Sequence, residues 1–157
     1  MAAAGQEFDP MFGVWKVRHR RLASRLAGAD DWRDFEGRSE TRPILGGAGN
    51  VEDNHILMPD GAYRAAAFRS WDAAARRWSI WWLDGRAPGA LETPVRGGFE
   101  AGLGAFYAED AFEGRPIRVR FLWRGIGTDA PRWEQAFSTD GGENWETNWT
   151  MDFARPS

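Results

Sequence analysis

Residues 133–149 constrain the fold of this chain more than any other stretch. In 133–138, and again in 145–153, large side chains alternate with small or polar ones. A period of two over this length is typical of half-buried strands. Between them, Asp140-Gly141-Gly142 supplies residues that accept the positive φ angles of a tight turn. The sequence therefore predicts a β-hairpin, with Trp133, Gln135 and Phe137 on its inner face.

The same alternation, broken by turn residues, continues through the rest of the chain. It predicts further strands over residues 13–26, 32–45, 50–58, 63–71, 77–83, 95–101, 105–112 and 117–124. No window combines a helical period with helix caps, so long helices are not expected. The one helical element expected is a short turn at Asp9-Pro10.

About ten consecutive strands with short turns predict an all-β fold, a single antiparallel up-and-down β-barrel. We expect one domain over residues 1–157, with residues 1–12 as an N-terminal arm and plug. A barrel of more than eight strands has room for a ligand. A two-sheet sandwich is the alternative. The inner face is expected to carry Trp15, Trp78, Trp82, Phe121, Trp123, Trp133, Phe137, Trp145, Trp149 and Phe153.

Composition narrows the function classes. The chain has no cysteine and only two histidines, His19 and His55, far apart, so we expect no metal site and no cofactor. Ten-stranded barrels of the nitrobindin type bind haem through a histidine on a late strand, and no histidine follows residue 55 here, so haem is disfavoured. A net charge of −3 with interleaved acids and bases argues against a nucleic-acid partner. No apolar run suits membrane insertion, and residues 1–10 do not read as a secretory signal. We expect a soluble cytoplasmic protein.

Two short motifs are read as structural. Gly13-x-Trp15 resembles the opening of the calycins, which include lipocalins and fatty-acid-binding proteins. That resemblance implies that Arg155 stacks on Trp15 to close the barrel base. The turn containing Ser138, Asp140, Gly142, Asn144 and Trp145 resembles an Asp-box, which ties up the backbone of a hairpin turn and implies no sialidase activity.

A longer pattern resembles a family of bacterial proteins of unknown function with a calycin-like, lipocalin-type barrel. The matching stretches are His19-Arg-Arg-Leu22, Trp32-x-x-Phe35-x-Gly37, Arg69-Ser-Trp-Asp72 with Trp78, Phe106-Tyr107-x-Glu109-Asp110, Gly114 to Phe121, Trp133 to Gly142 and Trp145 to Trp149. The resemblance covers most of the chain and implies a fold but no activity.

The candidate ligand-binding residues are His19, Arg69, Trp82, Trp123, Gln135 and Trp149. An inward His19 is either a base or ligand-orienting donor, or a hydrogen-bonded interior histidine. Arg69 is either a clamp for a carboxylate or sulfonate, or half of a buried ion pair. It points inward only if Tyr63 shares its face; the opposite assignment turns Arg64 and Phe68 inward.

The leading hypothesis is a binding module for a small, largely apolar aromatic or acyl molecule, because such sites are mainly apolar with a few placed donors. The second is an enzyme on the same barrel, a cyclase, isomerase or hydrolase acting on a hydrophobic metabolite. The third is a ligand-free scaffold that forms a homodimer through Trp81 and Leu83, which alternation places on the outer face.

Overall fold

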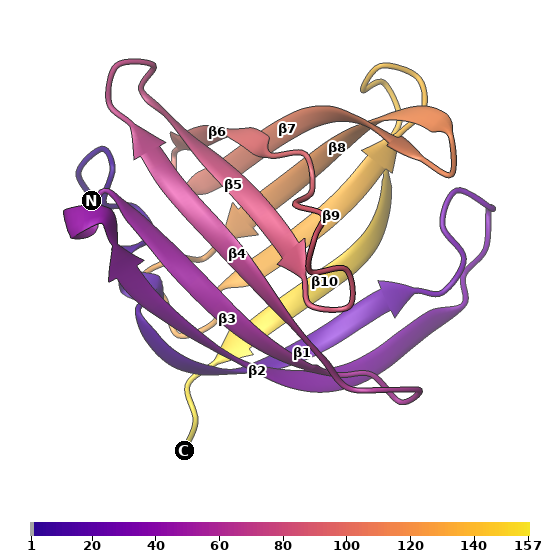
Figure 1. The fold of residues 1–157 in the computed structure, drawn as a ribbon, viewed down its shortest axis with the longest axis horizontal. Helices are drawn as coiled ribbons and strands as arrows, with labels where there is room; N and C mark the ends of the chain where they lie inside the picture. Colours follow the sequence, from indigo (N-terminus) through magenta and orange to yellow (C-terminus); the bar gives the residue numbers. More distant parts are fainter. Residues whose placement is uncertain (1) are drawn as a thin grey trace.

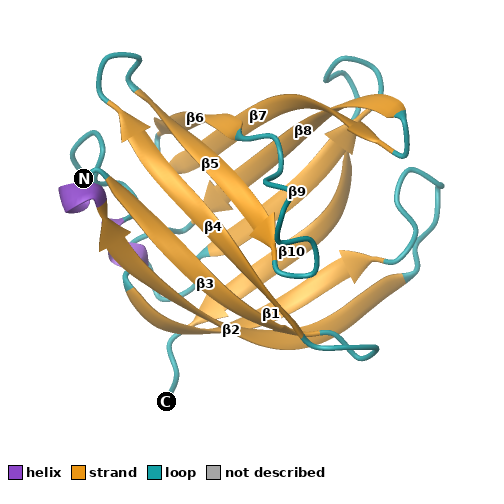
Figure 2. Ribbon diagram, in the orientation of Figure 1, coloured by secondary structure: helices purple, strands orange, loops and turns teal. Residues whose placement is uncertain are grey.

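A computed structural model describes residues 2–157. Its strands follow one another around a closed antiparallel barrel, in which β1 pairs with β10 to complete the ring (Figures 1 and 2). This confirms the predicted up-and-down barrel and excludes the sandwich. The strands are β1 (Gly13–Leu22), β2 (Trp32–Ile44), β3 (Gly49–Leu57), β4 (Tyr63–Asp72), β5 (Arg77–Asp84), β6 (Val95–Glu100), β7 (Leu103–Phe112), β8 (Arg115–Arg124), β9 (Arg132–Ser138) and β10 (Glu146–Ala154).

Alternating strand direction divides the connections between the two ends of the barrel. The loops that follow β1, β3, β5, β7 and β9 share one end, which we call the mouth (Figure 1). The 3-10 turns η1 (Asp9–Met11) and η2 (Leu45–Gly47) lie at the other end, the base (Figure 2). No helix among residues 2–157 is long and apolar enough to cross a membrane.

The N-terminal arm fills the base. Phe8 and Met11 are fully buried, and Phe8 packs edge-to-face on Trp78 with ring centroids 4.9 Å apart. Trp15 donates its indole N–H to the carbonyl of Met11 at 2.8 Å. The Arg155 guanidinium lies 3.6 Å from the Trp15 ring centroid, which is the contact expected from the sequence. The first and last strands are therefore joined at the base by side chains as well as by backbone.

A β-bulge in β10 changes which residues face inward. Pairing with β9 shifts between Thr147 and Trp149, so strict alternation does not hold across Asn148. As a result Trp149 points into the barrel, but Trp145 lies on the outer face, where the guanidinium of Arg120 is 4.4 Å from its ring centroid. The prediction that Trp145 lines the interior is wrong, because alternation cannot reveal an extra residue in one strand.

The turn after β9 has the geometry expected of an Asp-box. The Ser138 hydroxyl accepts the N–H of Gly142 at 2.9 Å, and the Asp140 carboxylate accepts the N–H of Asn144 at 2.8 Å. Gly141 and Gly142 have φ angles of +74° and +98°, which suit glycine. Hydrogen bonds from Asn144, then from Ser138, lower the pKa of Asp140 to about 2. These bonds hold the turn in one conformation.

The outer surface carries charged pairs other than those predicted. Glu134 pairs with Arg124 and Arg132, and Glu146 accepts the backbone N–H of Leu26 at 2.7 Å. The period-two pattern of the sequence predicts that both glutamates instead pair with Arg118 and Arg120 across strands. That prediction is wrong, since Arg118 pairs with Glu109 and the Glu146 carboxylate reaches the β1–β2 loop.

Two further features correct or complete the sequence interpretation. β1 ends at Leu22 instead of Leu26, since Leu26 has a φ of +58° inside the β1–β2 loop. On β4, alternate residues from Tyr63 to Arg69 are buried, so Arg69 faces inward. Trp81 and Leu83 are half-buried, and a dimer contact through them stays a prediction.

Candidate functional site

The barrel interior contains a cavity that opens toward the mouth. Its volume is about 160 Å³, and we call it the mouth cavity. A cavity needs only about 10–15 Å³ on this measure to hold one water, so side chains do not fill the upper interior. The wall is apolar and comes mainly from β5, β8, β9 and β10: Ile80, Trp82, Ile117, Val119, Phe121, Trp133, Phe137 and Trp149.

Aromatic rings make the deepest part of this wall rigid. Trp149 packs edge-to-face against Trp82 and Trp133, with centroids 5.6 Å and 5.2 Å apart. Edge-to-face contacts of this kind add about 0.5–1.5 kcal/mol beyond area burial. Gln135 also lines the cavity, but its amide already donates to the Asn148 side chain at 2.8 Å. The floor therefore presents indole and phenyl surface with few free polar groups.

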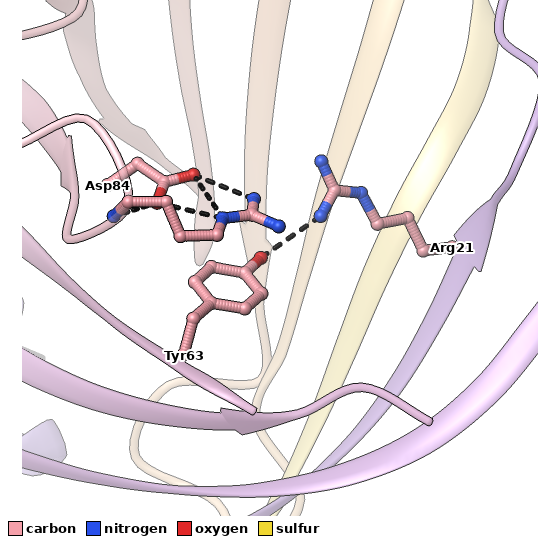
Figure 3. Close-up of polar contacts among 4 residues, drawn as sticks. Arg21, Tyr63 and Asp84 are labelled. Carbon is pink, nitrogen blue, oxygen red and sulfur yellow. Dashed lines mark hydrogen bonds and ion pairs between the residues drawn. The ribbon is translucent and has the colours of Figure 1, made fainter. Parts of the chain in front are cut away.

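The rim of the mouth cavity is polar and strongly charged. Arg21, at the end of β1, donates to the Tyr63 hydroxyl at 3.0 Å, as Figure 3 shows. Its guanidinium also lies 4.2 Å from the centroid of a Trp149 ring. Arg25, in the β1–β2 loop, has its guanidinium 5.4 Å from the Phe112 ring centroid. Burial, and then the charge of Arg21, lower the pKa of Arg25 to about 10, so Arg25 remains cationic at neutral pH.

Acidic groups occupy the outer part of the same rim. Asp84 is held by Arg86 at 2.8 Å, and the Arg86 guanidinium stacks over the Tyr63 ring at 3.6 Å (Figure 3). Glu92 and Asp110 also line the opening and are exposed to water. The Glu92 residue as a whole is exposed, but its carboxyl lies within the opening: desolvation there, followed by the charges of Asp84 and Asp110, raises its pKa, and the charges of Arg21 and Arg25 act in the opposite direction.

Arg69 does not reach the mouth cavity. It forms a buried ion pair with Glu52 and donates to the Asn50 side chain at 2.9 Å. Both charged side chains are at most 3 % exposed. A void of about 20 Å³ lies beside the pair and is also lined by Trp123; this is room for about one water. The structure thus has the buried ion pair that the sequence left as one alternative for Arg69.

His19 lies behind Trp149 and does not line the mouth cavity. Its Nδ1 accepts the Trp149 indole N–H at 3.0 Å, and its ring stacks on Phe35 with centroids 4.8 Å apart. The other nitrogen, Nε2, faces Gly37, where a Cβ would lie only 2.9 Å away. Burial, with a smaller contribution from Arg21, lowers the pKa of His19 to about 3. The neutral ring positions Trp149 and has no lone pair directed at the cavity.

Acidification is expected to destabilise the protein through His19. The unfolded chain binds a proton at this histidine below about pH 6.5, but the folded chain stays neutral down to about pH 3. Stability is therefore lost as the pH falls through that window, by roughly 2 kcal/mol between pH 6.5 and 5. Urea unfolding at both pH values should show this loss in the wild type and a smaller loss in His19→Gln. An equal loss in the two proteins would contradict the assignment.

The six residues predicted from sequence to bind ligand thus separate into two groups. Trp82, Gln135 and Trp149 line the mouth cavity, whereas His19, Arg69 and Trp123 lie beside or below it. The sequence interpretation missed Arg21, Arg25 and Tyr63 at the rim, and Glu52 as the partner of Arg69. Arg21 lies two residues after His19 on β1, so strand alternation could have placed it on the inner face. Arg25 lies in a loop, where alternation does not predict the direction of a side chain.

Comparison with known proteins does not assign the chain to a family. No protein-family model matches the chain, and a search of curated proteins finds no sequence that is significantly similar. Within residues 2–157, no three His, Asp or Glu side chains are grouped so as to hold a metal ion.

Proposed function

We propose that the protein binds one small, largely apolar molecule in the mouth cavity. The observation that carries this proposal is an aromatic-walled cavity of about 160 Å³ that stays open in a barrel whose base is densely packed. A cavity of about 150 Å³ lined by apolar side chains is large enough for benzene. The ligand's buried part is therefore one aromatic ring or a short acyl chain, and anything larger extends through the mouth.

A binding role is favoured over catalysis by what surrounds the cavity. His19, the histidine considered as a base, is already engaged, because its Nδ1 accepts the indole N–H of Trp149. Apolar walls with a few placed donors are typical of binding sites.

The test is ligand titration followed by intrinsic tryptophan fluorescence and calorimetry. The probes are phenylacetamide, phenylacetate, hexanamide and hexanoate. Glycerol, a small polar molecule without a ring or acyl chain, is the control that should not bind. Since Trp82, Trp133 and Trp149 line the cavity, binding should change the emission. For molecules of this size we expect dissociation constants from about micromolar to millimolar. Failure of all four probes to bind would overturn the proposal.

A cavity-filling substitution provides the matched variant. Val119 points into the mouth cavity and is 7 % exposed. In Val119→Trp the larger side chain should occupy the cavity. The affinity for every probe should then fall by about tenfold or more, because a probe can enter only by displacing the packed indole. Val14→Trp, on the exposed outer face of β1, is the control and should bind like the wild type. Circular dichroism checks that both variants remain folded, and unchanged binding in Val119→Trp would place the probes elsewhere.

A further inference from the structure

The arginines at the rim lack the partners that the other buried arginine has. Within residues 2–157, no carboxylate lies within 4 Å of the guanidinium of Arg21 or Arg25. Arg69 is paired with Glu52, and Arg86 with Asp84. Guanidinium groups held in a partly buried position are normally paired with an anion. Glu92 on the same rim interacts electrostatically with both arginines, but no carboxylate of residues 2–157 is in ion-pair contact with either of them. These two half-buried, adjacent cations therefore mark a place for a ligand anion.

Arg21 and the loop that carries Arg25 are held in position by neighbours that a ligand need not disturb. Arg21 rests on the Trp149 ring and donates to Tyr63. The loop carrying Arg25 is fixed on both sides, since Ser24 donates to Asp31 at 2.6 Å and Leu26 donates to Glu146 at 2.7 Å. A guanidinium that is already fixed loses less conformational entropy on binding an anion.

The Tyr63 hydroxyl supplies a third donor. Its oxygen accepts from Arg21, and no acceptor for its own proton occurs among residues 2–157. Tyr63 is only 7 % exposed and lines the mouth cavity. Because a hydroxyl both accepts and donates, its proton is free for a ligand atom beside Arg21.

On the basis of the proposed function, we infer that the ligand is a monocarboxylate, whose carboxylate binds Arg21, Arg25 and the Tyr63 hydroxyl while its ring or short acyl chain enters the aromatic cavity. A carboxylate matches the planar fork of a guanidinium and can accept from several donors at once. A second carboxylate on the ligand would lie against Glu92 and Asp110 on the outer rim and be repelled. The apolar part fills the volume between Trp82, Trp133 and Trp149.

The experiment compares each acid with its amide on the same protein. Phenylacetate and hexanoate are titrated calorimetrically at neutral pH beside phenylacetamide and hexanamide, which have the same shape without the charge. The acids should bind about tenfold or more tightly than the amides, and the difference should shrink as salt is raised. If the amides bind as tightly as the acids, the inference fails while the proposed function stands. If neither binds, both fail.

Substitutions at the rim test whether Arg21, Arg25 and Tyr63 cause the preference for acids over amides. Arg21→Gln and Arg25→Gln should each weaken the acids by about tenfold and leave the amides nearly unchanged. Tyr63→Phe keeps the ring under Arg86 and should weaken the acids about threefold to tenfold. The control is Arg64→Gln, which removes one positive charge from an exposed outer position paired with Asp53. A preference for acids that survives in both rim variants would overturn the inference.

Discussion

Replacing Glu52 by Leu is expected to lower the free energy of unfolding by about 3–5 kcal/mol. The substitution leaves Arg69 charged in the base of the barrel, where its side chain is 2 % exposed. Its guanidinium would then have the Asn50 oxygen and the faces of Phe8 and Trp123, 4.7 Å and 5.2 Å from the ring centroids. These neighbours do not replace a carboxylate, because removal of one partner leaves the desolvation cost of the other charge uncompensated.

The double variant separates the cost of one unpaired buried charge from the net contribution of the ion pair to the free energy of unfolding. Arg69→Met alone should also cost about 3–5 kcal/mol, since it leaves Glu52 buried without a cation. Glu52→Leu with Arg69→Met should cost far less than the sum, within about 2 kcal/mol of the wild type, because apolar side chains of similar volume replace both charges. Denaturant unfolding at neutral pH measures all four proteins. Additive losses in the double variant would contradict this account.

Replacing Trp15 by Ala is expected to cost about 3–5 kcal/mol in unfolding free energy. Trp15 is 2 % exposed and packs edge-to-face on Phe153. It also carries the Arg155 guanidinium on one face and donates to the Met11 carbonyl. Loss of the Trp15 side chain opens a cavity between the first strand, the last strand and the N-terminal arm. The contact of β1 with β10 that closes the barrel is therefore weakened.

Two substitutions serve as controls for Trp15→Ala. Trp15→Phe retains a ring against Phe153 and should have a clearly smaller effect, since it loses the indole N–H and part of the packed area. Trp32→Ala removes a partly exposed indole that stacks under Arg20, and should cost about 1 kcal/mol or less. Thermal unfolding followed by circular dichroism ranks the three variants. A loss for Trp32→Ala as large as that for Trp15→Ala would argue against a special role for the base.

The charged groups of the candidate site lie at the rim of the mouth cavity, whereas Arg69 lies toward the base. The sequence left Arg69 as either a ligand clamp or half of a buried ion pair, and in the structure Glu52, 17 residues away along the chain, pairs with it. Beside the aromatic cavity, Arg21 and Arg25 form no ion pair with a carboxylate of residues 2–157. Which cation is free depends on which acids share its side of the barrel, and alternation along one strand does not contain that information.

Local sequence determined the strands, the turns and the closed barrel. Alternation reports which side of a strand is buried, and the Asp140-Gly141-Gly142 turn requires backbone angles that few residues accept. Tertiary structure alone decided the bulge at Asn148, which moved Trp145 outside, and the pairing of Glu52 with Arg69. It also decided where the packed interior ends and the mouth cavity begins. These features depend on register and contact between strands distant in the chain, whereas alternation and turn chemistry act only between neighbouring residues.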